Sequence, residues 1–422
     1  MDVKAFTLVV FSSTYLYLIL SHRGKAFAIW AGVILIVIFG DLELREVPGL
    51  INWNVIGIFA GTLVIAELFI YSKVPVLLSD ILVSRSRTVG MAILWVCILS
   101  SFLSAFIENV ATVLIVAPVA LALARRLRTS PIPFLIGLAI CSNLQGTATL
   151  IGDPPSMILA GYEKMNFNDF FIFKGRPGIF FAVELGAIAS FVVLYFMFRR
   201  YRDPVEKIPI ERPTSWVPTA ILLGMIGALA VSPTLDPDFG YLGGVVCLLF
   251  GAIGLAWQFW RERERGEEIL KNYDWETTFF LAGIFVMVGS LRDVGLIDDL
   301  AHWINSITGR SLFWSYTFIV WFSVLFSAFI DNVPYITAMI PVAHILAAEV
   351  GCSPYLLVFG LLIGSCLGGN ITPIGASANI VSVGILKRNG YRTSFLQFVR
   401  IGLPFTMAAT AAGYAFIWWI WR

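Results

Sequence analysis

The chain has 422 residues, of which 58% are hydrophobic and only 13% are charged, and its net charge is +2 at pH 7. A soluble globular protein carries roughly a quarter charged residues, so a soluble enzyme, a nucleic-acid-binding protein and a disordered scaffold are excluded. The five cysteines form no CxxC pair, so no disulfide framework, metal site or cofactor is expected. The composition predicts an all-α polytopic membrane protein.

Apolar stretches that could form membrane helices, which need about 20 residues each, follow one another along the chain. In chain order they centre on residues 5–20, 26–40, 53–71, 89–107, 110–127, 131–160, 178–198, 214–232, 241–259, 275–291, 311–330, 333–349, 354–385 and 398–420.

Two pairs of these stretches meet without a loop, at Glu108-Asn109 and at Asp331-Asn332. A charged residue beside Asn in the middle of some forty apolar residues is typical of the tip of a re-entrant helical hairpin. Such backbone is tolerated at membrane depth only where it is buried in protein or lines a wet cavity. We therefore expect hairpins over residues 88–127 and 311–349, together with about ten full spans.

The distribution of basic residues sets the orientation. If both pairs form hairpins, one side of the membrane receives the loops near 21–25, 72–88, 125–130, 199–213, 260–276 and 386–400, which hold 21 of the 29 Lys and Arg. An excess of Lys and Arg marks the cytoplasmic side. A multi-pass protein of the cell (inner or plasma) membrane is expected, with 199–213 as a cytoplasmic linker.

The sequence also repeats itself at an offset of 223. Residues 103–120 align with 326–343, with nine identities in eighteen columns, and residues 142–159 align with 365–382, with six. Matched Asn, Pro and Gly in register indicate a duplication rather than a chance likeness of apolar helices.

Each half, 1–198 and 214–422, would cross the membrane five times, so the two repeats must have opposite orientations. Inverted repeats with interrupted helices at matching places are typical of secondary transporters. The interruptions fall within 131–160 and 354–385, which are expected to be broken helices.

Hairpin tips and helix breaks should converge on a site near the membrane midplane. Gly and Pro let a helix unwind, which frees carbonyl groups for a cation and N–H groups for solute oxygens. The candidate substrate-binding residues are Asn109, Thr112, Asn143, Thr147, Thr149, Asn332, Asn370, Thr372, Ser377 and Asn379. Single Ser, Thr and Gly residues also serve helix packing, and that alternative stays open for each of them.

Carboxylates inside the membrane are costly, and they are taken as functional by default. Glu108, Asp153 and Asp331 are therefore the candidate proton- or ion-coupling residues, the alternative being that they cap backbone N–H groups. If ionised, the two tip carboxylates Glu108 and Asp331 oppose a di- or trivalent anion and favour a cation, a proton or a neutral solute. No catalytic or metal-binding group is expected, and no enzyme.

The tips FIENVATV and FIDNVP, the stretch GTATLIGDPPSMI and the stretch GSCLGGNITPIGASANIVSVGI resemble the ion transporter superfamily. Within it they are most similar to the branch of the arsenite permeases, the D-type Na⁺/H⁺ antiporters and the P protein. The resemblance implies an elevator-like fold, a homodimer and a substrate site on Asn109, Thr112, Asn143, Thr147, Asn332, Asn370 and Thr372. The dicarboxylate branch has Ser-Asn-Thr at both tips, which this chain lacks.

The resemblance favours proton-coupled efflux of arsenite, antimonite or a related metalloid oxyacid. A Na⁺/H⁺ antiporter is the first alternative, and an anion conductance or a carboxylate or other anion carrier is the second. The expected partners are a small inorganic solute, protons or Na⁺, and membrane lipid. The resemblance adds a cytoplasmic ATPase as a partner, and no nucleic acid is expected.

Overall fold

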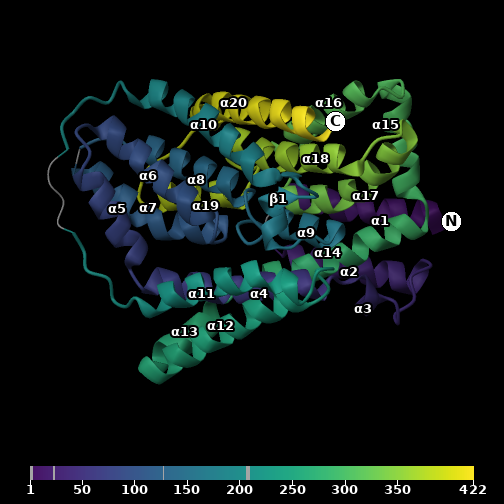
Figure 1. Cartoon of the computed structure of the whole chain (residues 1–422), viewed down its shortest axis with the longest axis horizontal. Coiled ribbons are helices and arrows are strands. Elements are labelled where there is room, and N and C mark those ends of the chain that lie inside the picture. Colours follow the sequence, from purple (N-terminus) through teal and green to yellow (C-terminus); the bar gives the residue numbers. More distant parts are fainter. Residues whose placement is uncertain (1–2, 22–23, 127, 206–209) are drawn as a thin grey trace.

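The computed structural model describes residues 3–21, 24–126, 128–205 and 210–422, so residues 206–209 of the expected linker and residue 127 of the first hairpin lie outside it. The described chain is almost entirely helical, and most helices run along the long axis of the molecule (Figure 1).

The first half contains ten helices of α type in the described residues, one 3₁₀ helix and a two-stranded hairpin. Their bounds are α1 (Val3–Leu20), α2 (Lys25–Phe39), α3 (Val47–Leu50), α4 (Trp53–Tyr71), α5 (Val74–Ser84), α6 (Val89–Ser104), α7 (Asn109–Arg126), α8 (Ile132–Gly146), α9 (Pro154–Glu163), η1 (Phe167–Phe170), β1 (Ile172–Phe173), β2 (Arg176–Pro177) and α10 (Ile179–Phe198).

The second half follows a similar order. Its elements are α11 (Val217–Val231), η2 (Ser232–Thr234), α12 (Leu242–Arg261), α13 (Arg263–Asn272), α14 (Trp275–Asp293), α15 (Leu296–Thr308), α16 (Leu312–Ser327), α17 (Asn332–Val350), α18 (Pro354–Gly368), η3 (Gly369–Ile371), α19 (Ser377–Arg388) and α20 (Phe395–Trp421). The segments 72–88 and 260–276, which we expected to be loops, contain the helices α5 and α13.

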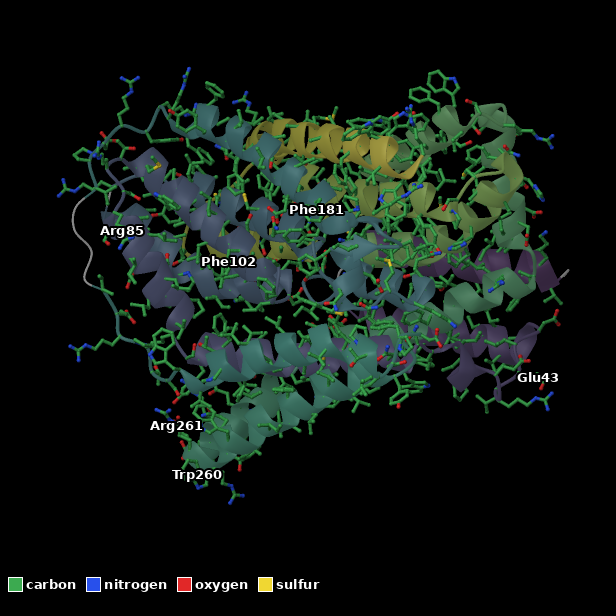
Figure 2. The ribbon with its side chains drawn as sticks, in the orientation of Figure 1. Glu43, Arg85, Phe102, Phe181, Trp260 and Arg261 are labelled. Carbon is green, nitrogen blue, oxygen red and sulfur yellow. The ribbon has the colours of Figure 1, made fainter. Side chains whose placement is uncertain are left out.

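Nine helices of the described chain are long and apolar enough to cross a membrane, and further apolar helices of 10–17 residues accompany them. Large apolar side chains face outward between the two ends of the molecule. Phe102 is 61% exposed and Phe181 is 41% exposed, and both lie between the end marked by Arg85 and the end marked by Glu43 (Figure 2). Soluble proteins rarely expose apolar patches of this extent, so the fold is that of an all-α polytopic membrane protein.

Charged segments far apart in the sequence meet at one end of the molecule. Thr88 pairs with Pro204 in a β-bridge, and the Arg125 guanidinium donates a hydrogen bond of 2.7 Å to Asn389. Tyr71 donates to Glu262 at 2.8 Å. The described parts of 72–88, 199–213 and 260–276 therefore lie together, and those of 125–130 lie beside 386–400. Their common position on the cytoplasmic side, with 21–25, stays a prediction.

The helices form two bodies. Helices α6–α10 pack with α16–α20, and we call this group the hairpin body. Helices α1, α2, α4, α11, α12 and α14 pack with one another, and we call this group the scaffold. In Figure 1, α4, α11, α12 and α13 lie along the lower side and the hairpin body lies above them. The two bodies face each other where the helices of the hairpin body are interrupted.

Candidate functional site

The two hairpins enter from opposite ends of the molecule, with α6 and α7 on the left of Figure 1 and α16 and α17 on the right. Each tip is closed by its own carboxylate. Glu108 accepts a hydrogen bond of 2.9 Å from the Ala111 N–H, and Asp331 accepts one of 3.1 Å from the Val333 N–H. A carboxylate satisfies the free N–H groups at a helix start and suits the helix dipole, so each tip can stop inside the protein.

Both broken helices unwind opposite a tip. The chain leaves α8 at Gly146 and re-enters a helix at Pro154, and it leaves α18 at Gly368 and re-enters at Ser377. Glycine lets these segments touch the tips, because a Cβ at Gly152 would lie 2.6 Å from the Ser104 carbonyl oxygen. A Cβ at Gly375 would lie 2.8 Å from the carbonyl oxygen of Ser327.

The tips and breaks are joined by side-chain amides. Asn109 donates to Asn143 at 3.1 Å and to Asp153 at 3.0 Å. Asn143 donates to Asn370 at 3.0 Å, and Asn332 approaches the second oxygen of Asp153 at 3.5 Å. All five side chains are buried. Polar groups from both halves thus meet in one continuous network.

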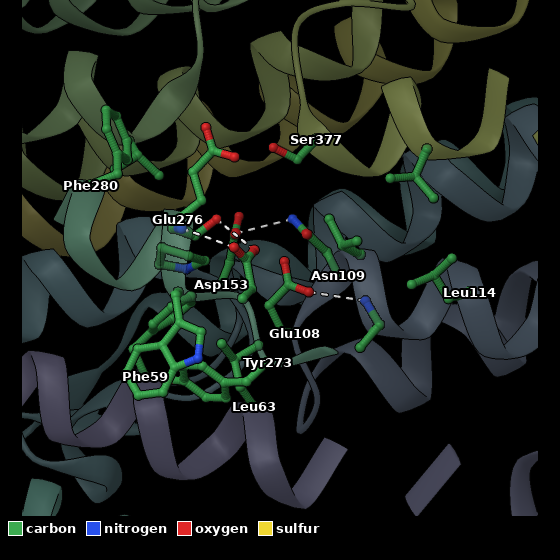
Figure 3. Close-up of a pocket in the computed structure, with 18 of the residues that line it drawn as sticks. Phe59, Leu63, Glu108, Asn109, Leu114, Asp153, Tyr273, Glu276, Phe280 and Ser377 are labelled. Carbon is green, nitrogen blue, oxygen red and sulfur yellow. Dashed lines mark hydrogen bonds between the residues drawn. The ribbon is translucent and has the colours of Figure 1, made fainter. Parts of the chain in front are cut away.

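A cavity of about 600 Å³ opens between this network and the scaffold. In Figure 3, Glu108, Asp153 and Glu276 turn toward the same space, with Asn109 and Ser377 beside them. The carboxylates that line it are Glu67, Glu108, Asp153, Asp274, Glu276 and Asp331. Among the described lining residues, Lys25 is the one basic side chain.

Six of the thirteen residues predicted from the sequence line this cavity: Glu108, Asn109, Asp153, Asp331, Asn332 and Ser377. Asn143 and Asn370 lie behind them in the amide network.

The remaining five predicted residues bond to main-chain oxygens instead of facing the cavity. Thr112 donates to Ile107, Thr147 to Asn143, Thr149 to Ala105, Thr372 to Ala328, and Asn379 to Gly369 and Thr372. In this conformation they hold the tips and breaks in place, and their contact with solute stays a prediction. Unwound backbone needs such partners when it is buried.

Sequence reasoning missed Lys25, Asp274 and Glu276. Lys25 was counted among the basic residues of a cytoplasmic loop, but its ammonium lies 2.6 Å from Asp331 at the second tip. The signal available in the sequence was a lysine at the very start of an apolar helix, where a cation opposes the helix dipole. Asp274 and Glu276 were read as part of the charged segment 260–276, yet they reach the cavity from the start of α14.

Contacts recur at the offset of the sequence repeat. Thr149 bonds to Ala105 as Thr372 bonds to Ala328, each pair 223 residues from the other. Such paired contacts are what two copies of one fold would produce, and they support the proposal that 1–198 and 214–422 are repeats.

The sequence profile of the citrate transporter family (CitMHS) matches residues 15–364. A Mycobacterium tuberculosis protein named "uncharacterized transporter" is 30% identical over 443 residues, which cover 99% of this chain and 98% of the relative. The human P protein is 28% identical over 412 residues, which cover 79% of this chain and 49% of that protein.

Among solved structures, the YdaH transporter of Alcanivorax borkumensis resembles this fold, with a TM-score of 0.58. The likeness covers 98% of this chain and 96% of that chain at 15% identity. Bacterial relatives and repeated apolar helices place the chain in the plasma membrane as a multi-pass protein. The chain therefore belongs to the citrate transporter family of the ion transporter superfamily, and it is a secondary transporter rather than an enzyme.

Proposed function

We propose that this transporter exports a small neutral metalloid hydroxide, of the arsenite or antimonite class, in exchange for protons carried on the cavity carboxylates. The observation that carries the proposal is the chemistry of the cavity. Six carboxylates and one ammonium among the described lining residues make its surroundings acidic. Free citrate, a trianion at neutral pH, would be repelled by them, whereas a neutral hydroxide or a cation would not.

The amides supply what a hydroxylated solute needs. Asn109 lines the cavity, and its Oδ1 is buried without a hydrogen-bond partner among the described residues. A buried acceptor without a hydrogen bond raises the free energy of the folded protein by about 1–3 kcal/mol. A solute whose hydroxyl donates to this oxygen removes that penalty and therefore binds more tightly. Asn332 and Ser377 add further neutral groups around the same space.

We further propose that the hairpin body moves against the scaffold to open the site alternately to each side. A second cavity of about 340 Å³ supports this, since it is lined by Asn52, Tyr162, Arg292 and Pro341 at the other end of α9. The tips and breaks would then travel with the solute while α4 and α14 stay in place. An assembly of two copies and a cytoplasmic ATPase partner remain proposals that rest on the family resemblance.

The test is transport by the full chain in everted vesicles. A pH-sensitive dye is followed while arsenite, antimonite, Na⁺, Li⁺ and citrate are added one at a time, and vesicle metalloid is measured by mass spectrometry. We expect arsenite and antimonite to accumulate in acid-loaded vesicles and to dissipate the pH gradient. Asn109→Ala should lower the accumulation several-fold.

A dye response to Na⁺ or Li⁺ without metalloid movement would overturn this proposal. It would favour a Na⁺/H⁺ antiporter, which the convergence of Glu108, Asp153 and Asp331 on one cavity also supports. A response to citrate alone would show that the carboxylates are neutralised before the solute binds, and would return the chain to the carboxylate carriers.

A further inference from the structure

Lys25 stands in an unusual place. It is the first residue of α2, directly after Gly24, whose φ is 66°. Helix N-termini favour anions, so a lysine there gains nothing from its own helix. Its side chain is only 17% exposed, although most lysines keep their charged end in water. The stability of α2 therefore does not explain this residue.

The surroundings of Lys25 explain its position better. Its ammonium lies 2.6 Å from an Asp331 oxygen, and its main-chain N–H donates to Glu276 at 2.9 Å. The ring of Phe280 lies 5.9 Å away. Among the described lining residues, the other carboxylates are Glu67 on α4, Asp274 on the scaffold, and Glu108 and Asp153 on the hairpin body, and Tyr273 adds a phenol. Lys25 thus places one fixed cation among six carboxylates.

The pair also joins the two bodies. Lys25 begins α2, which packs against α1 and α14 and is fastened by a 2.9 Å hydrogen bond from Trp30 to the Phe279 carbonyl. Asp331 caps α17 at the tip of the second hairpin. Any movement of the hairpin body against the scaffold must separate these two groups.

We propose that Lys25 is a coupling residue, which holds the second tip to the scaffold through Asp331 and releases it when Asp331 takes up the coupling cation. This inference rests on the proposed function, because it assumes that the cavity carboxylates bind protons or Na⁺. A neutralised or cation-bound Asp331 no longer attracts the ammonium, so loading the site with the coupling cation opens the lock. On the return step the solute opens it, because a solute hydroxyl that donates to Asp331 takes the place of the ammonium. An empty site restores the pair, which discourages movement without cargo.

The first experiment uses the unaltered protein in detergent. Exposed amines are acetylated briefly, and the modification of Lys25 is measured by peptide mass spectrometry as a ratio to that of Lys73. Lys73 is a matched control, since it also pairs with a carboxylate, Glu211 at 3.2 Å, but at the surface. The ratio removes the general effect of pH on amine reactivity.

We expect the ratio to rise several-fold on acidification, or when Na⁺ or Li⁺ replaces choline, and to be high under all conditions in Asp331→Asn. A ratio that stays flat for acid, Na⁺ and Li⁺ overturns the proposal, because the pair would then be static. An unchanged ratio in a folded Asp331→Asn variant also overturns it, because the pair would not exist in solution. No metalloid enters this assay, so a failed solute assignment and a failed lock are told apart.

The second experiment follows coupling in proteoliposomes, with the solute that the vesicle assay identifies. Lys25→Met should lower uptake driven by a pH gradient by about tenfold, the size of a typical coupling between two sites, while downhill exchange continues. Lys25→Arg keeps the charge and Lys73→Met removes the surface lysine, so both should behave as the unaltered chain. If Lys25→Met lowers driven uptake and downhill exchange equally, the role is structural and the proposal falls. Should Lys25→Met fail to fold, the double variant Lys25→Met, Asp331→Asn removes both charges and takes its place.

Discussion

The first hairpin tip is bound to its own body, whereas the second tip is bound to the scaffold. Asn109 donates to Asn143 at 3.1 Å and to Asp153 at 3.0 Å, both within the hairpin body. Among the described residues, the Asn332 side chain makes only the 3.5 Å approach to Asp153, and Asp331 beside it pairs with Lys25. Two tips of nearly the same sequence thus have different partners.

The difference arises in the segments that face the tips. Asp153 ends the first break, and the position 223 residues later is Ala376. Likewise Asn143 corresponds to Cys366. A repeated backbone therefore carries an asymmetric set of charges, and we infer that the second tip is held less tightly to its own body than the first.

Removing the shared carboxylate should have the largest effect on transport. Asp153→Asn keeps the shape but replaces the charged acceptor of Asn109 with an amide. Hydrogen bonds to a charged group are worth about 1.5–3 kcal/mol, so we expect solute exchange to fall by at least about tenfold. The measurement is initial uptake in proteoliposomes, and Ala376→Ser at the matching position is the control. Equal loss in both variants would mean that the asymmetry has no functional meaning.

Adding a methyl group where a break contacts a tip should destabilise the protein by a similar amount in both halves. Gly152→Ala and Gly375→Ala each place a methyl group against backbone, which costs about 1–3 kcal/mol when nothing can move aside. Both should unfold at lower temperature in detergent. Gly384→Ala is the control, since no atom lies within 4 Å of its added Cβ. A large difference between Gly152→Ala and Gly375→Ala would argue against equivalent tips.

Replacing the tip asparagines Asn109 and Asn332 should lower the stability of the protein by different amounts. Asn109→Ala removes the donor to the Asn143 amide oxygen and the nearer of two donors to Asp153, and we expect a loss of about 1–3 kcal/mol in the free energy of unfolding. Asn332→Ala removes a contact at the limit of hydrogen bonding, so the loss should be below about 1 kcal/mol. Thermal unfolding of both variants in the same detergent measures the difference, and the reverse order would show that the second tip is the better anchored.

The smallest effects are expected at the paired hydroxyl groups. Thr149→Val and Thr372→Val remove equivalent bonds to the Ala105 and Ala328 carbonyl oxygens. Each should cost about 1 kcal/mol, and the two losses should be alike. Thr317→Val, on a half-buried hydroxyl that bonds to Phe313 at 2.7 Å and to Tyr414 at 2.8 Å, is a control outside the site.

The sequence by itself determined the membrane class, the spans, the hairpins and the breaks. Composition excludes a water-exposed surface, and Glu108-Asn109 and Asp331-Asn332 interrupt apolar runs that would otherwise be continuous helices. The carboxylates could be chosen in advance as well, because an acidic residue inside a membrane is costly wherever the chain places it. These are local properties of the chain.

Only the tertiary structure decided which of these residues face the cavity. Thr149 and Thr372 are predicted to bind solute, and in this conformation their hydroxyl groups bond to main-chain oxygens. Buried, unwound backbone needs such partners, which its sequence neighbours cannot supply. Lys25 looked like a loop residue but reaches Asp331, 306 residues away in the chain. Pairing across such a separation depends on how the scaffold packs against the hairpin body, and no local pattern in the sequence encodes that packing.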